Sequence, residues 1–332
     1  MAAALGVMLG LAFFAVACTD VASAPQSDPL LRLVRTIELP QVRGRIDHLA
    51  FDPARGRLFV AALGNDTVEV LDTARGEHLR SLSGFHEPQG IALVPEMSAV
   101  AVANGDTGTL QLLDTDAYRT RWTVQVGEDA DNVRYDHASK RLLVAAVGGL
   151  IAVDPSAGEV KGRLGISGHP ESFQLEREGA RVFANLPGAS RIVVGNRSSM
   201  TATSRWPTEK CGSNYPMALD EPGHRLFVGC RSPASVALVE TSDGRVVTSV
   251  PAVGDTDDLF YDADRRRLYV IGGEGAVDVF ARDGDALQRQ ARVSTRAGAR
   301  TGLWVASESR LYVAVPARRG SPAEIRVFEA PP

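Results

Sequence analysis

The 332-residue sequence lacks an excess of positive charge, and it has few cysteines and few aromatic side chains. Its formal net charge is −4 at pH 7, which disfavours nucleic acid as a partner because phosphate contacts need a surplus of Lys and Arg. The motifs G-x-S-x-G, H-E-x-x-H, the P-loop and C-x-x-C-H are also missing. The sequence therefore leaves open whether the protein is an enzyme and assigns no catalytic residue.

The N-terminus has no charged residue up to Cys18 and is almost wholly apolar, as in the apolar region of an export signal. Cleavage is expected before Cys18, which would then carry lipid, or after Ala24 in an A-x-A pattern. An uncleaved membrane anchor is the alternative, although 18 residues is at the lower limit for spanning a bilayer. We expect residues 1–24 to be a signal and short linker, and residues 25–332 to form a single extracytoplasmic domain, periplasmic or attached to the cell envelope.

One short sequence motif, of the type Arg-Leu-Phe-Val, recurs along the chain. Its first apolar residue stands at Leu58, Val100, Leu142, Val182, Leu226, Leu268 and Leu311, so the spacings are 42, 42, 40, 44, 42 and 43 residues. Turn-forming residues divide each copy into four short strands, predicted in the first copy at 48–51, 58–63, 67–72 and 77–82. Four strands at this period are typical of a β-propeller blade.

The repeats predict an all-β fold, a seven-bladed β-propeller with four-stranded blades. The last copy supplies only three strands, and Leu31–Leu39 resembles the missing outer strand. We therefore expect an N-terminal strand to complete the last blade and close the ring. A solenoid is the alternative, but it would need atypical capping repeats, which the sequence does not show.

The stretch from Gly64 to Glu96, "GNDTVEVLDTARGEHLRSLSGFHEPQGIALVPE", resembles the YVTN-type β-propeller repeat family of YncE-like proteins. The resemblance covers essentially the whole chain after the N-terminal segment and is specific for fold but weak for function. It implies an exported bacterial protein. The third copy lacks the Asn of the repeat, and the fourth lacks its Asp.

The repeat register places Cys211 in the loop entering the fifth blade and Cys230 at the end of that blade's second strand. Both should lie at the same rim, so a disulfide is expected in an oxidising compartment. The two cysteines could instead be free buried thiols. A functional alternative is that they form a redox pair or bind a metal ion.

Function on a propeller usually lies where the loops entering the blades meet the central channel. The predicted ligand-binding mouth consists of residues at or close to the position that lies eleven residues before the first apolar residue of each repeat. They are Asp47, His48, His86, Gln89, Asp131, Asn132, His169, Glu171, Tyr215, Asp257, Asp258 and Arg300. Clustered carboxylates attract cations. The polar residues could instead cap strand starts through backbone hydrogen bonds.

No cofactor is certain from the sequence, but His and carboxylate side chains suit a divalent metal ion, with Asp47, His48 and His86 as the expected nucleus. We expect an exported, lipid-anchored monomer that binds a protein partner or a small polar or cationic ligand at this mouth. The alternative is a metal-assisted hydrolase or lyase acting there on a lactone or ester.

Overall fold

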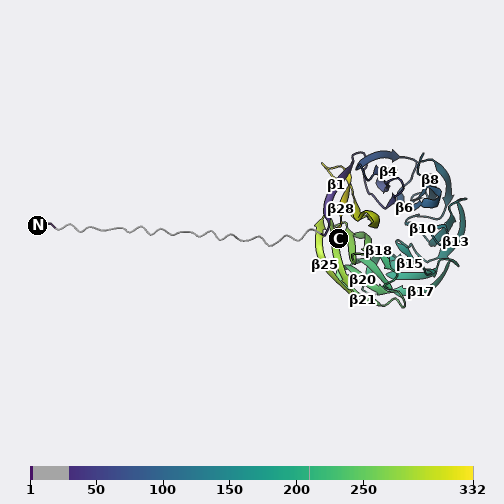
Figure 1. The fold of residues 1–332 in the computed structure, drawn as a ribbon. Helices are drawn as coiled ribbons and strands as arrows, with labels where there is room; N and C mark the ends of the chain where they lie inside the picture. Colours follow the sequence, from purple (N-terminus) through teal and green to yellow (C-terminus); the bar gives the residue numbers. More distant parts are fainter. Residues whose placement is uncertain (3–29, 209, 332) are drawn as a thin grey trace.

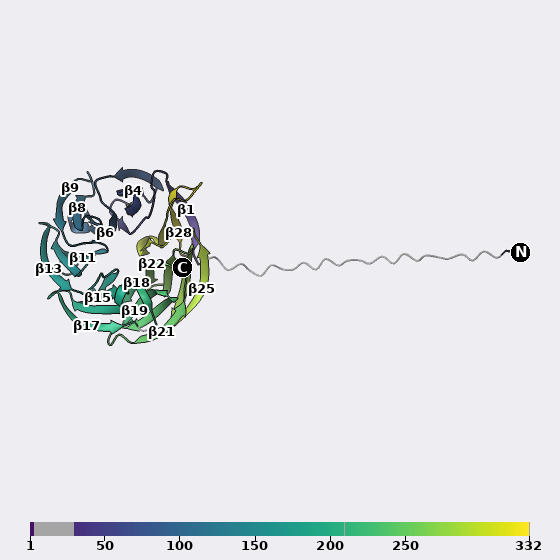
Figure 2. The same cartoon turned by 180° about the vertical axis from the view of Figure 1, so that it is seen from behind.

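A computed structural model describes residues 1–2, 30–208 and 210–331. The predicted signal segment, with Cys18 and the cleavage point after Ala24, lies outside the described residues. Seven four-stranded antiparallel sheets form a closed ring around a central channel (Figures 1 and 2), as the repeat spacing predicts. Within the described residues, no helix is long and apolar enough to cross a membrane.

Blades 1 to 6 each consist of four consecutive strands. The strands of blades 1 to 3 are β2 (Leu49–Asp52), β3 (Arg57–Ala62), β4 (Thr67–Asp72), β5 (Glu77–Leu82), β6 (Pro88–Val94), β7 (Ala99–Asn104), β8 (Thr109–Asp114), β9 (Thr120–Gln125), β10 (Val133–Asp136), β11 (Arg141–Ala146), β12 (Gly149–Asp154) and β13 (Glu159–Gly165). Those of blades 4 to 6 are β14 (Phe173–Leu175), β15 (Arg181–Leu186), β16 (Arg191–Asn196), β17 (Thr201–Pro207), β18 (Gly212–Asp220), β19 (Arg225–Ser232), β20 (Ala234–Glu240), β21 (Val246–Pro251), β22 (Thr256–Asp262), β23 (Arg267–Gly272), β24 (Ala276–Asp283) and β25 (Ala286–Ser294).

Blade 7 joins the two ends of the described chain. It contains β26 (Gly302–Val305), β27 (Arg310–Val315) and β28 (Ala323–Glu329), with β1 (Arg32–Leu39) as its outer strand. This confirms the predicted closure, since β1 pairs antiparallel with β28 from Arg32 opposite Glu329 to Leu39 opposite Ala323. Short 3-10 turns lie at η1 (Leu63–Asn65), η2 (Pro95–Met97), η3 (Pro187–Ala189) and η4 (Ala306–Glu308).

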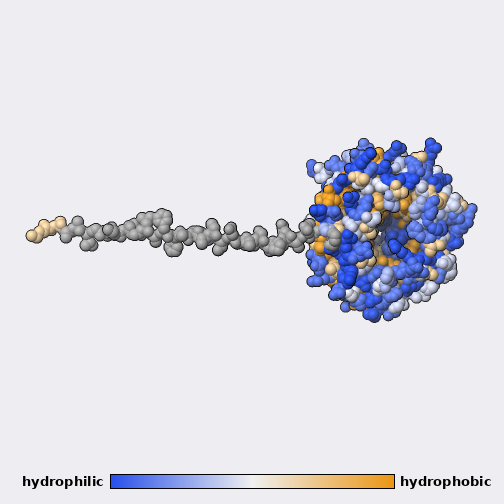
Figure 3. Space-filling view, viewed as in Figure 1, coloured by the Kyte–Doolittle hydropathy of each residue, from blue (hydrophilic) through white to orange (hydrophobic). Residues whose placement is uncertain are grey.

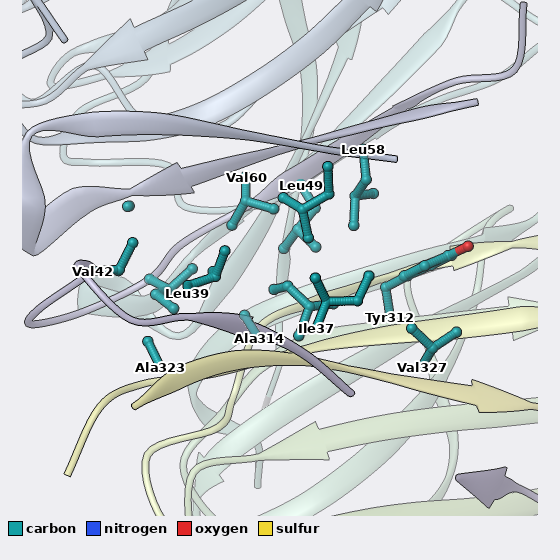
Figure 4. Close-up of a cluster of buried hydrophobic side chains, with 14 of the residues drawn as sticks. Ile37, Leu39, Val42, Leu49, Leu58, Val60, Tyr312, Ala314, Ala323 and Val327 are labelled. Atoms are coloured by element: carbon teal, nitrogen blue, oxygen red, sulfur yellow. The ribbon is translucent and has the colours of Figure 1, made fainter. Parts of the chain in front are cut away.

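Apolar side chains fill the interface between neighbouring blades. Figure 4 shows the joint between blades 7 and 1, where Ile37 and Leu39 of β1 pack with Leu58 and Val60 of β3 and with Tyr312 of β27. The second strand of a blade is buried on both faces, as in β3, because a blade lies against each of them. The outer strands are mostly exposed, so the ring is held together from within by burial of apolar surface.

A disulfide joins Cys211 and Cys230, as predicted from their shared rim. Their Cα atoms are 5.1 Å apart and both residues are buried. The bond links the start of blade 5 to its second strand and lies in the apolar cluster between blades 4 and 5.

Candidate functional site

The loops that enter the blades bring charged side chains to one mouth of the channel. Figure 3 shows the disc face on, with an opening at its centre and hydrophilic residues over most of the visible face. A cavity at the mouth is lined by Arg45, Asp47, His48, Asp131, Asn132, Glu171, Ser172, Tyr215 and Asp257. Its volume is about 10 Å³, which is about the space that one water molecule needs.

Backbone hydrogen bonds hold the acidic residues in equivalent positions in three blades. The N–H of Asp47 donates to Ala61, that of Asp131 to Ala145 and that of Glu171 to Asn185, at 2.8, 2.9 and 3.1 Å. Each of these hydrogen bonds joins the residue just before the first strand of a blade to the end of the second strand of the same blade. Repetition of one small sheet thus places carboxylates at corresponding points around the channel.

Seven of the predicted mouth residues line the cavity, namely Asp47, His48, Asp131, Asn132, Glu171, Tyr215 and Asp257. The other five do not. His169, Asp258 and Arg300 contact lining residues through ion pairs, and Gln89 donates to Asp129 Oδ1 at 2.9 Å. His86 is exposed, and its backbone N–H donates to Asn104.

The predicted metal nucleus of Asp47, His48 and His86 does not form a ligand set. Across the described residues, the three-residue group able to hold one ion is Asp131, His169 and Glu171, whose ligand atoms all lie within 4.8 Å of one another. These residues come from the entrances of blades 3 and 4, which are neighbours in the ring. The predicted nucleus differs from this group in its histidine: His86 is exposed, whereas His169 Nδ1 lies 3.2 Å from Glu171 Oε1.

The carboxyl group of Asp131 is buried without a matching donor. The residue is 6% exposed, and its Oδ1 has no hydrogen-bond partner within the described part of the chain. Burial, together with the carboxylates of Asp47 and Glu171, raises the pKa of Asp131 well above its usual range. This acid is therefore the least compensated charge of the mouth.

Glu171 and His169 pair with each other. His169 Nδ1 lies 3.2 Å from Glu171 Oε1, and His169 Nε2 lies 3.1 Å from the backbone oxygen of Asp129. Burial works against charge on both groups, but their mutual attraction lowers the pKa of Glu171 and raises that of His169 to about 9.

Arginines surround Asp257 on the other side of the cavity. Arg300 Nε lies 2.8 Å from Asp257 Oδ2, Arg231 pairs with Oδ1, and Arg45 lies 3.8 Å from Oδ2. Burial still raises the pKa of Asp257 to about 6 against these three cations. The mouth thus has one carboxylate that arginines compensate and another, Asp131, that they do not.

His48 lies between two carboxylates. Its Nδ1 is 3.4 Å from Asp258 Oδ2, its Nε2 is 3.6 Å from Asp47 Oδ1, and the side-chain amide of Asn132 is 3.1 Å from Nε2. Burial opposes the imidazolium, but Asp258 and Asp47 outweigh it and raise the pKa of His48 to about 10. His48 is consequently a cation at neutral pH.

Sequence reasoning missed the role of Arg231. Its guanidinium lies 3.7 Å from the ring centre of Tyr215, and its Nε donates to the backbone oxygen of Thr256 at 2.9 Å. Arg231 belongs to β19, a second strand, whereas the prediction considered only residues before the first strands. The second strands also end at this mouth. The position of Arg231, directly after Cys230 near the end of a second strand, could therefore have predicted that it lies there. Ser172 was missed as well.

Comparison with known proteins supports the fold and leaves the function open. No family model matches the sequence, and no curated protein matches it closely. A structure titled hydrazine synthase, from Kuenenia stuttgartiensis, superposes with a TM-score of 0.73 at 15% identity, covering 83% of this chain and 93% of that chain. A chain of a mitotic checkpoint complex superposes with a TM-score of 0.75 at 14% identity, covering 97% and 98%. At these identities the shared feature is the seven-bladed propeller.

Proposed function

We propose that the protein is an exported, lipid-anchored binding module that takes up a small cation or a cationic group at the channel mouth. The observation that carries the proposal is the buried carboxyl group of Asp131, which faces the cavity without a donor on Oδ1. A buried charge is costly unless a partner of opposite sign accompanies it. A bound cation is such a partner.

The repeat pattern and the disulfide support the other parts of the proposal. The YVTN-type repeat and the propeller fold fit the family of exported proteins that the sequence resembles. A buried disulfide fits an oxidising compartment. The apolar N-terminal segment and Cys18 fit a lipoprotein signal.

The ring closure also suggests how an anchored molecule is oriented. β1 begins at Arg32 on the face opposite the mouth and runs to Leu39 at the mouth side, next to the loop that carries Asp47. The chain between Cys18 and Leu31 can reach at most roughly 45 Å. A lipid on Cys18 would therefore be joined to the ring at its far face, on the side away from the mouth.

Cation binding can be tested by thermal melting of the purified protein with spermidine, lysine and divalent metal chlorides. A ligand at about a hundred times its Kd stabilises the folded state by about 2.7 kcal/mol, which corresponds to a few degrees in Tm. We expect such a shift for at least one cation in the wild type and its loss in Asp131→Asn. Asp243→Asn, which changes an exposed carboxylate, is the matched control. Equal behaviour of the two variants would remove the mouth as the site.

Lipid anchoring needs a separate test. Metabolic labelling with an alkyne fatty acid should tag the wild-type protein and not Cys18→Ala. The variant should move from the membrane fraction to the soluble fraction, with unchanged melting of the propeller. Labelling that persists without Cys18 would disprove the anchor.

A metal-assisted hydrolase or lyase is the second candidate, favoured by the ligand set of Asp131, His169 and Glu171. The state of His48 weighs against it, because a pKa of about 10 leaves no lone pair for a general base at neutral pH. Hydrolysis of lactones or esters that requires added metal, and that His48→Gln reduces, would favour the enzyme over the binding module.

A further inference from the structure

We propose that Asp131, His169 and Glu171 form a specific site for one divalent transition-metal ion of the Zn²⁺ or Mn²⁺ class. This inference rests on the proposed function of the mouth and specifies its ligand. The ligand atoms come from two adjacent blades and lie within 4.8 Å of one another. Ligands on a tetrahedral ion with bonds of about 2.0–2.2 Å are roughly 3.3–3.6 Å apart, so small side-chain shifts close the site.

His169 is already oriented as a metal ligand. Its Nε2 lies 3.1 Å from the backbone oxygen of Asp129, which can accept only from a protonated Nε2. A metal ion that displaces the other ring proton would then find the lone pair on Nδ1, the atom that faces Glu171 at 3.2 Å. Metal-bound histidines usually donate their second N–H to a carbonyl or carboxylate in this way, which fixes the tautomer and the ring orientation.

Asp131 provides a second, independent observation that points to an ion. Its side chain is more than nine-tenths buried, it lines the cavity, and its Oδ1 accepts no hydrogen bond from the described residues. The side-chain amide of Asn132, which lines the same cavity, lies 3.1 Å from His48 Nε2. A metal ion would supply the missing partner for Asp131 and balance two carboxylates with one double charge.

The donor set selects the class of ion. One imidazole nitrogen with two carboxylate oxygens suits Zn²⁺, Mn²⁺, Co²⁺ or Fe²⁺, whereas Ca²⁺ takes six to eight oxygen ligands and Mg²⁺ prefers oxygen and water. Three protein ligands also leave a coordination position for water or for a donor group of an incoming molecule. The cavity volume of about 10 Å³ is enough for one water molecule there.

The neighbouring groups do not offer a better site. Asp257 already pairs with Arg231 and Arg300, and an ion beside it would face those cations. His48 lies between Asp47 and Asp258, so both of its ring nitrogens face an acid. Within the described residues, no salt bridge joins Asp131, His169 or Glu171 to an arginine, although the charge of Arg231 helps to lower the pKa of Glu171.

The proposal can be tested by isothermal titration calorimetry of the EDTA-treated, dialysed full chain with ZnCl₂, MnCl₂, CoCl₂, CaCl₂ and MgCl₂. We expect one ion per chain, with a transition metal binding at least about tenfold more tightly than Ca²⁺ or Mg²⁺. Asp131→Asn, His169→Gln and Glu171→Gln should each weaken binding by about a hundredfold or more. His137→Gln and Asp243→Asn, at exposed positions, are the matched controls and should bind as the wild type does.

A second measurement guards against variants that fail to fold. Without metal, each variant must give the circular dichroism spectrum of the wild type and melt cooperatively at a temperature no lower than the wild type, and anomalous X-ray scattering from a Zn²⁺ or Mn²⁺ soak should place the ion between the three side chains. Absence of stoichiometric binding, or an ion located elsewhere, overturns the metal site. If spermidine or lysine binds in an Asp131-dependent manner while no metal does, the cation-binding function stands and this inference falls. If no cation of either kind binds, both fall.

Discussion

Asp131→Asn should stabilise the metal-free protein, although the substitution removes one of the three proposed metal ligands. The asparagine side chain keeps nearly the same shape and carries no charge. Burial raises the pKa of Asp131 well above that of an aspartate in an unfolded chain. Folding therefore has to proceed with either a buried charge or an added proton, and the variant avoids both costs.

The size of the effect follows from linkage. An unfolded aspartate titrates near pH 3.9, so holding a proton on it at pH 7 costs at most about 4 kcal/mol, at about 1.36 kcal/mol for each of roughly three pH units. Local relaxation and water reduce this, and about 1–3 kcal/mol is typical of a buried group without a partner. For a chain of this size, that range corresponds to a rise in Tm of about 2–5 °C.

The sign can be checked against pH. A raised folded-state pKa costs nothing below the unfolded pKa, and its cost grows as pH rises toward the folded pKa. The stability gain of Asp131→Asn should therefore be close to zero near pH 4 and largest at pH 7 to 8. Urea unfolding in EDTA at several pH values measures it, with Asp243→Asn as the surface control. A variant that is less stable than wild type at pH 7, or a gain that does not vary with pH, would refute the reasoning.

Three further results are expected. Replacing Cys211 and Cys230 by Ala opens a loop with a sequence separation of 19 residues and should lower the unfolding free energy by about 3 kcal/mol in denaturant titration; an unchanged midpoint would contradict this. Leu39→Ala, at a fully buried residue of β1, should cost about 2–4 kcal/mol and speed hydrogen exchange in blade 7, whereas Leu33→Ala, at an exposed residue, should not; equal exchange in both variants would argue against β1 as the closing strand. The raised pKa of His48 stabilises the folded state fully below pH 6.5, and this contribution, at most about 5 kcal/mol, is lost as pH rises toward 10. His48→Gln should flatten that decline, and a profile parallel to wild type would show that His48 is not the titrating group.

The fold was predictable because its signals are local and repeated. Turn residues bound each strand, so the predicted limits of β4 and β5 agree with the structure to the residue, and β2 differs by one residue at each end. The closing strand β1 was found because the last repeat lacked an outer strand. The structure places β1 in blade 7, as that gap required.

The site was less predictable because charge compensation depends on side chains from distant segments. The repeat register found the carboxylates, but it did not find that Arg231 comes to Asp257 from the end of a second strand. It also put His48 and His86, and not His169, in the predicted metal nucleus. Whether a histidine is half-buried beside a carboxylate, as His169 is, or exposed, as His86 is, depends on loop conformation that repeat spacing does not encode.

The contrast between two acids in one cavity argues that the mouth serves a ligand. Arg45, Arg231 and Arg300 around Asp257 show that this fold can bring arginines to a buried carboxylate where stability requires it. Asp131 shares the cavity, and among the described residues no arginine forms a salt bridge with it. A residue that only capped a strand would need no buried charge, and asparagine or serine would serve there at lower cost. Unfavourable groups of this kind persist at sites where binding recovers the energy, and the cost of burying Asp131 is therefore the reason for proposing that a cation binds beside it.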